Sequence, residues 1–246
     1  MMRFLSLLAF LFPALAAAQT TGGVFGPTVS LDDRQVQYRI AIADAPAGDA
    51  LWNHRIHYQE PLSEDLRVRG VVGTRETPDS EVDFDFVQAE LAWQYTPDGQ
   101  PYQAGLRFDA TVRGDDRPDG IALNWVNQWV WGEDPRRKDW RARLLLLNFL
   151  QVADRTSDEL AFQTRFEVSR AVGNVSGRPL RVGGEGFVNL GDTGGLDVLN
   201  RRSGALVGPY ATIGLGNEVS VFLGTLHGIS GGATDDQVRL WLTKGF

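Results

Sequence analysis

The chain ends in "TDDQVRLWLTKGF", residues 234–246, and this stretch alternates apolar with more polar side chains. The apolar row is Val238, Leu240, Leu242 and Phe246, interrupted by Lys244, and the other row is Arg239, Trp241, Thr243 and Gly245. In a β-strand, successive side chains point to opposite faces. The end of the chain therefore predicts a strand with unlike faces that finishes on a free aromatic residue.

The same alternation recurs along most of the chain. Residues 102–113 and 160–169 each pair a continuous apolar row with a charged row, and turn residues separate such segments. Several segments exceed the ~5–6 residues usual in globular sheets and match the roughly 9–11 residues that a tilted strand needs to cross a bilayer. The pattern predicts strands at residues 35–42, 50–59, 66–74, 82–95, 102–113, 121–132, 140–152, 159–171, 179–190, 203–215, 218–227 and 237–246.

The first residues have the features of a secretory signal peptide. Arg3 precedes an apolar run at residues 4–15, and three alanines before Gln19 form a small-residue cleavage site. The apolar run is too short for a helical membrane span of roughly 20 residues. We therefore expect a signal peptide at residues 1–18, which is cleaved on export, and one domain at residues 19–246.

The composition argues against several kinds of site and partner. The chain has no cysteine, so it has neither disulfides nor thiolates for metal binding or catalysis. Its formal net charge of −7 argues against a general nucleic-acid binder. His54 and His57 are three residues apart on a predicted strand, hence on opposite faces, which makes a poor metal pair. We expect no cofactor, no metal and no nucleic-acid partner.

Two all-β architectures fit the strand pattern. A soluble sandwich or lipocalin-like barrel buries its apolar rows inside, whereas a membrane barrel turns them outward. Aromatic residues at strand ends favour the membrane, because aromatic belts mark the lipid interface; the alternative is that they clamp hairpin ends. These residues are Tyr95, Tyr102, Trp131 and Trp140. The predicted fold class is all-β, a transmembrane antiparallel up-and-down β-barrel of about 12 strands.

Three segments depart from the regular pattern. Within residues 82–95 the apolar row changes parity, which places Phe86 in the outward row and predicts a β-bulge near Val87. Residues 143–150 are apolar on both faces, so we expect them to pack on an interior plug or on a neighbouring subunit. Residues 24–30 would make an odd extra strand. They are expected at the periplasmic end of the barrel or along its interior.

The closing strand resembles that of bacterial outer-membrane β-barrels, which typically ends in phenylalanine preceded by alternating hydrophobic residues. Val238, Leu240, Leu242 and Phe246 match that assembly signal, and Lys244 departs from it, because a hydrophobic residue is commoner at its position. The resemblance implies that the barrel-assembly machinery reads this strand and that both termini lie in the periplasm. The expected surroundings are outer-membrane lipid and lipopolysaccharide, with the protein a monomer.

A narrower resemblance lies within roughly the last third of the domain, at residues 184–228. They look like an uncharacterised family of small outer-membrane barrels, described only as a domain of unknown function. The matching positions are Glu185, Phe187, Asn189, Asn200 and Arg201. This family implies no known activity.

The rows opposite the apolar ones would face the lumen, and they are rich in arginine. The candidate anion-binding residues are Arg107, Arg113, Arg141, Arg143, Arg165, Arg181 and Arg239, with Trp241 nearby. Guanidinium groups suit carboxylates and phosphates, and basic rings select anions in pores. This composition is similar to that of small monomeric channels for acidic sugars, which implies an anionic solute such as an acidic oligosaccharide. The alternative is a structural barrel whose arginines and acids pair without transport.

A lipid-modifying enzyme is a further alternative. His227 and Ser230, within "LHGISGG", resemble the His-x-Ser site of lipid A deacylases, although the spacing is one residue longer and Gly231 stands where that family has asparagine. Such chemistry needs a base beside the nucleophile and a third group that orients the base. Asp235 or Asp236 is the candidate for the third group. This alternative implies hydrolysis of lipid A or phospholipid.

Overall fold

The computed structural model describes residues 21–44, 50–77, 80–114, 119–132, 139–152, 160–175, 177–192, 204–230 and 236–246. The predicted signal peptide lies outside these residues. The strands are β1 (Gln35–Asp44), β2 (Ala50–Pro61), β3 (Leu66–Thr77), β4 (Ser80–Gln94), β5 (Tyr102–Arg113), β6 (Asp119–Trp131), β7 (Trp140–Val152), β8 (Leu160–Val175), β9 (Arg178–Asp192), β10 (Ala205–Gly216), β11 (Val219–Gly228) and β12 (Asp236–Gly245). Each overlaps one predicted segment.

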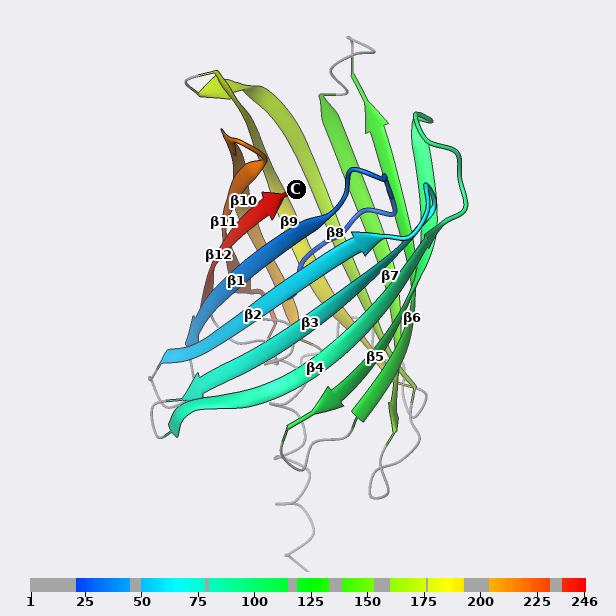
Figure 1. Ribbon diagram of the computed structural model, residues 1–246. Helices are drawn as coiled ribbons and strands as arrows, with labels where there is room; N and C mark the ends of the chain where they lie inside the picture. The colour runs from blue at the N-terminus through cyan, green and yellow to red at the C-terminus, as the bar shows by residue number, and fades with distance from the viewer. Residues whose placement is uncertain are drawn as a thin grey trace, which may run out of the picture.

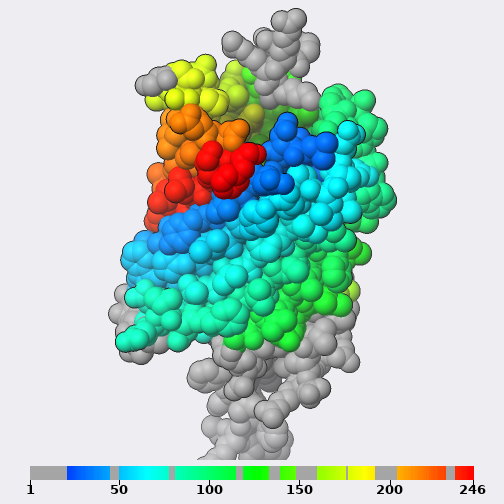
Figure 2. All heavy atoms as spheres, viewed as in Figure 1, coloured from blue at the N-terminus to red at the C-terminus, as the bar shows by residue number. Residues whose placement is uncertain are grey.

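The strands form a closed antiparallel barrel in which each strand pairs with its sequence neighbours (Figure 1). The first and last strands close it, with pairs from Gln35 and Gly245 to Ala43 and Gln237. In Figure 2 the red C-terminal strand lies directly against the blue first strand. Because the sheet is closed, none of the twelve described strands has an unpaired edge.

Among the described residues, no helix has the length and apolar character that a membrane span requires.

The outer surface of the barrel is apolar and its interior is polar. On β12, Val238 and Leu242 are each 48% exposed. Gln237 and Arg239, on the other face of the strand, point into the lumen and are almost completely buried. The same inversion holds on β5, where Phe108 is exposed and Arg107 and Asp109 are buried. A soluble barrel would have the opposite arrangement. The predicted fold class is therefore confirmed.

The four aromatic residues singled out at strand ends lie at one end of the barrel. This is the end where β1 begins and β12 finishes, and we call it the terminal end. Tyr95, Tyr102 and Trp131 are exposed there, and the rings of Trp131 and Trp140 stack with centroids 6.1 Å apart. Such exposed rings at one level of the wall fit a belt at the membrane interface.

Lys244, the residue that departs from the assembly signal, has a local structural role. Its Nζ donates a hydrogen bond of 2.7 Å to the carbonyl oxygen of Asn217, in the two-residue turn between β10 and β11. Asn217 and Glu218 both have positive φ, as a tight hairpin turn of this length requires. The ammonium group also lies 3.7 Å from the Glu218 carboxylate. The Lys244 ammonium group therefore links β12 to the strained turn between β10 and β11.

The β-bulge in β4 differs in one detail from the expectation. The ladder between β3 and β4 shifts where Gly73 faces Phe86 and Thr74 faces Phe84, so the extra residue is Asp85 rather than a residue near Val87. As a result, Asp85 and Phe86 are both buried in the lumen wall, and the prediction that Phe86 faces outward is wrong. Gly73 is the reason, because a Cβ there would lie 2.3 Å from the Phe86 ring.

The backbones of β10 and β11 approach each other closely at Gly208, and a substitution there tests the packing of the barrel wall. A Cβ on Gly208 would lie 1.8 Å from the carbonyl oxygen of Thr225, whereas a Cβ on Gly184 meets nothing nearer than 3.9 Å. We expect Gly208→Ala to lower the free energy of unfolding by about 1–3 kcal/mol, the usual cost of overpacking. Urea unfolding in lipid vesicles, with Gly184→Ala as the matched control, measures the difference. Equal stability of the two variants would contradict this packing.

Candidate functional site

The lumen of the barrel is lined by arginines and amide side chains. All seven arginines predicted for the lumen project inward, and Arg107, Arg165 and Arg239 are nearly fully buried. The other four are partly buried; Arg113 lines a cavity in the lumen, Arg141 and Arg143 reach Glu167, and Arg181 reaches Ser169. Further inward-facing residues, which the sequence analysis did not single out, are Arg55, His57, Gln59 and Glu90. Sequence analysis could have found them from the polar side chains that alternate with apolar ones along β2 and β4.

Three buried carboxylates bind several of these arginines. Glu90 lies 3.2 Å from Arg69 and 3.4 Å from Arg107, which also pairs with Asp109 at 2.7 Å. On the opposite wall, Glu167 accepts from Arg141 at 2.8 Å and from the Tyr210 hydroxyl at 3.1 Å. These networks neutralise part of the lumen charge. Charges this far from bulk water need such partners.

The ion pair between Arg239 and Glu185 is the most deeply buried one. The two side chains are 0% and 1% exposed. Arg239 comes from β12 and Glu185 from β9, so the pair joins two strands across the lumen. The Arg239 guanidinium also donates a 3.0 Å hydrogen bond to the carbonyl oxygen of Gly22.

A wall of stacked aromatic rings lies beside this ion pair. Tyr210, Phe222 and Trp241 stack in sequence, with centroids 5.2 Å and 3.8 Å apart. The guanidinium carbon of Arg39 lies 4.1 Å from the Trp241 ring centroid. Arg239 and Trp241 both face inward, and the lumen therefore offers cations next to aromatic faces.

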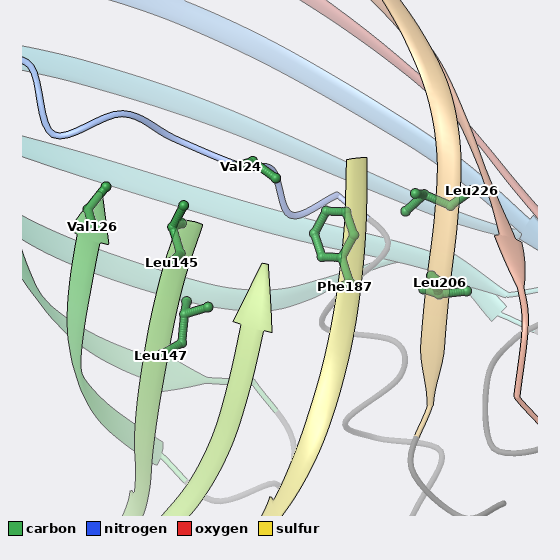
Figure 3. Packing of buried hydrophobic residues seen from close by; sticks show 7 residues of the cluster. All are labelled: Val24, Val126, Leu145, Leu147, Phe187, Leu206 and Leu226. Atoms are coloured by element: carbon green, nitrogen blue, oxygen red, sulfur yellow. The ribbon is translucent and has the colours of Figure 1, made fainter. Parts of the chain in front are cut away.

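The polypeptide before β1 lies inside the barrel. We call residues 21–34 the N-terminal segment; Figure 1 shows it running from inside the lumen to the start of β1 at the terminal end. Its Val24 packs in a buried cluster with Leu145 and Leu147 of β7 and Phe187 of β9 (Figure 3). The cluster is completed by Val126, Leu206 and Leu226. The expectation that residues 143–150 contact an interior plug is therefore met by Leu145 and Leu147.

The N-terminal segment separates two cavities in the lumen. One, of about 370 Å³, lies towards the terminal end and is lined by Val24, Gly26, Asp33 and Arg67 among others. The other, of about 130 Å³, reaches towards the opposite end and is lined by Gly22, Gly23, Arg113 and Arg165 among others. Both cavities are bounded by Phe25, Arg39, His57 and Arg69, which form the partition between them.

The residues of the enzyme alternative lie at the opposite end of the barrel. His227 Nδ1 is 2.6 Å from Asp236, and its Nε2 is 3.4 Å from Thr225 Oγ1. Ser230 Oγ accepts a 2.8 Å hydrogen bond from the backbone N–H of Ala205. Asp235 lies outside the described residues. Asp236, one of the two candidates for the third group, is therefore placed to orient His227, whereas the other ring nitrogen of His227 faces Thr225.

A closed twelve-stranded barrel with an apolar exterior and a charged lumen defines an outer-membrane β-barrel protein. Among solved structures, the chain is similar to the KdgM porin, at 7% identity over 86% of this chain and 99% of that chain, with a TM-score of 0.62. It is similar to the NanC porin at 7% identity over 87% of this chain and 100% of that chain, with a TM-score of 0.59. An outer-membrane channel from Pseudomonas putida F1 shares 10% identity over 86% of this chain and 94% of that chain, with a TM-score of 0.55.

At these identities the comparisons show the fold. No protein-family model matches the chain, and neither does any curated protein. The resemblance of residues 184–228 to the uncharacterised barrel family is therefore not confirmed. The anion-binding role of the lumen arginines stays a prediction.

The Arg239–Glu185 pair gives a second test. Glu185→Leu leaves the Arg239 guanidinium buried without its carboxylate, so we expect it to lower the free energy of unfolding by about 3–5 kcal/mol. Adding Arg239→Leu removes the isolated charge and should recover part of this loss. Urea unfolding in lipid vesicles compares both with Glu60→Gln, which disrupts an exposed pair with Arg34 and should cost less. A double variant no more stable than Glu185→Leu would contradict the isolated-charge explanation.

Proposed function

We propose that this protein is an outer-membrane channel that binds and passes small solutes carrying carboxylates, such as acidic oligosaccharides. The observation that carries the proposal concerns Arg39 and Arg165. Among the described residues, neither has a carboxylate within ion-pair distance, although they are only 8% and 9% exposed. Both lie in the middle of the lumen and line the smaller cavity.

The acceptors of these two arginines are neutral. Arg39 donates to Gln37 Oε1 at 2.6 Å and to the carbonyl oxygen of Thr21 at 3.2 Å. Arg165 donates to Gln163 Oε1 at 2.8 Å and to the carbonyl oxygen of Gly23 at 3.2 Å. Amide oxygens orient a guanidinium group but do not cancel its charge. The middle of the lumen therefore keeps a positive potential, which concentrates anions in a pore.

The aromatic wall favours a sugar over a bare inorganic anion. Trp241 presents its ring beside Arg39, and Phe222 continues the stack. A sugar acid has an apolar ring face and a carboxylate, and this surface offers a partner for each. A porin with the same fold, KdgM, has been determined in complex with oligogalacturonate, which supports this class of solute.

Uptake by proteoliposomes tests the proposal. We expect the purified protein to load trigalacturonate faster than maltotriose, a neutral sugar of equal length. Replacing Arg39 and Arg165 together by glutamine should remove most of this preference, because it removes the two cations without carboxylate partners.

The matched control is Arg34→Gln, because Arg34 precedes β1 and pairs with Glu60 outside the lumen partition. It should keep the preference of the wild type. Uptake no faster than in protein-free liposomes would refute the channel and leave the structural barrel as the better description. Faster uptake of maltotriose would refute the solute class.

A further inference from the structure

One kind of contact recurs between the barrel wall and the N-terminal segment, beside an ion pair of Arg67 with Asp33 at 2.8 Å and hydrogen bonds of Thr28 and Val29 to wall amides. Guanidinium groups donate to a series of backbone carbonyl oxygens: Arg39 to Thr21 at 3.2 Å, Arg239 to Gly22 at 3.0 Å, Arg165 to Gly23 at 3.2 Å, and Arg67 to Gly26 at 3.4 Å and Thr28 at 3.1 Å. These four arginines come from the neighbouring strands β1 and β12, from β3 close by, and from β8 further round the barrel. They hold the segment inside the lumen by its backbone.

A carbonyl oxygen is a weaker partner for a guanidinium group than a carboxylate is. Both bonds have a charged donor, but a carboxylate adds a full opposite charge and engages both arms of the fork. The segment nevertheless has the advantage of being tethered, since it competes at a high effective concentration. A solute with several carboxylates offsets that advantage because it can bind more than one arginine at the same time.

Apolar contacts add to the hold on the segment. Val24 is buried in the cluster shown in Figure 3, and Val29 is fully buried. The Phe25 ring lies under Arg107, with the guanidinium carbon 3.5 Å from the ring centroid. Gly23 allows the backbone to approach the wall, because a Cβ there would lie 2.5 Å from the Trp241 ring. The segment is therefore fitted to the lumen, and leaving it costs apolar burial.

The lumen also holds polar groups, in the partition and beside it, that the segment does not satisfy. Within the described part of the chain, the indole Nε1 of Trp241 and both ring nitrogens of His57 are buried without a hydrogen-bond partner. His57 lines both cavities and Trp241 lines the larger one. Buried polar atoms are usually paired. Their presence here points to a site built for polar ligands other than the segment.

We propose that the N-terminal segment is a built-in competitor for the solute: its carbonyls at Thr21, Gly22 and Gly23 occupy Arg39, Arg239 and Arg165, and a polycarboxylate displaces it. The segment closes the lumen when solute is absent. Solute then opens its own path by taking the same donors. This inference rests on the proposed channel function and adds a regulating element to it.

Single-channel recording of two substitutions in the segment tests the closure. Val24→Asp places a charge in the apolar cluster and should expel the segment, raising the open fraction about tenfold or more. Leu31→Asp is the matched control, because Leu31 belongs to the same segment but is 59% exposed. It should behave as the wild type does. Equal open fractions in Val24→Asp and the wild type would overturn the proposal.

A cross-link tests the same closure in the opposite direction. The chain has no cysteine, so Val24→Cys combined with Leu145→Cys introduces two unique thiols within one buried cluster. Once mass spectrometry shows the thiols joined by oxidation or a short bridging reagent, conductance and trigalacturonate uptake should be lost, and reduction of the disulfide should restore them. Val24→Cys alone, treated identically, should be unaffected. Thiols that do not cross-link would contradict the placement of the segment.

Labelling of the single-thiol variant tests the competition itself. Trigalacturonate should speed the reaction of the Val24→Cys thiol with a polar maleimide, and maltotriose should not. Suppose the wild type takes up trigalacturonate, but cross-linking does not reduce uptake and trigalacturonate does not speed the labelling. The competitor is then refuted, and the channel stands. If no variant, Val24→Asp included, takes up trigalacturonate, the channel itself is refuted.

Discussion

The closed hydrogen-bonded sheet is the constraint on which the rest of the structure depends. Lipid offers no partner to a backbone N–H or carbonyl, so a strand edge left open in the membrane costs several kcal/mol per group. The pairing of β1 with β12 removes that edge. Once the sheet is closed and its outer row is apolar, alternation sends every second side chain into the lumen. A crowded polar interior follows from closure before any function is considered.

Crowded charges must then be compensated where they lie, and the structure does this in three ways. Glu90, Glu167 and Glu185 pair with arginines of the wall. Amide side chains serve others, as Gln128 does for Arg143 at 2.6 Å. The third kind of partner is the backbone of the N-terminal segment. The N-terminal segment, which also pairs its Asp33 carboxylate with Arg67, is not part of the wall, so among the described partners it alone can leave without dismantling the barrel.

The strands and the direction of their faces were predictable because a period of two is a local property of the sequence. The inward rows on β5, β8 and β12 follow from it directly. The same logic explains why residues 143–150, apolar on both faces, signalled an object inside the barrel: Leu145 and Leu147 face inward and contact Val24. Here a departure from the pattern carried as much information as the pattern.

Other features depend on contacts between strands and were not predictable in this way. The extra residue in β4 lies at Asp85, because the Phe86 ring fills the space left by Gly73 on the neighbouring strand. Which carboxylate meets which arginine depends on how the strands are offset around the barrel. Residues 24–30 were expected at the periplasmic end of the barrel or along its interior, and they lie along the interior. Which arginines hold the segment was not predictable, because they bind backbone carbonyl groups, which every residue has.

The choice of arginine at the partition suits a site that exchanges one partner for another. The Arg39 guanidinium lies over Trp241 and donates to Gln37, so two wall residues orient it independently of the N-terminal segment. A planar, weakly hydrated cation can stack in this way, whereas a compact ammonium group cannot. If the Thr21 carbonyl leaves, Arg39 keeps its position, and an arriving carboxylate meets a donor that is already aligned. The cost of ordering the cation was met when the barrel folded, so occupancy depends on the gain from carbonyl to carboxylate set against the tether and the apolar burial of the segment.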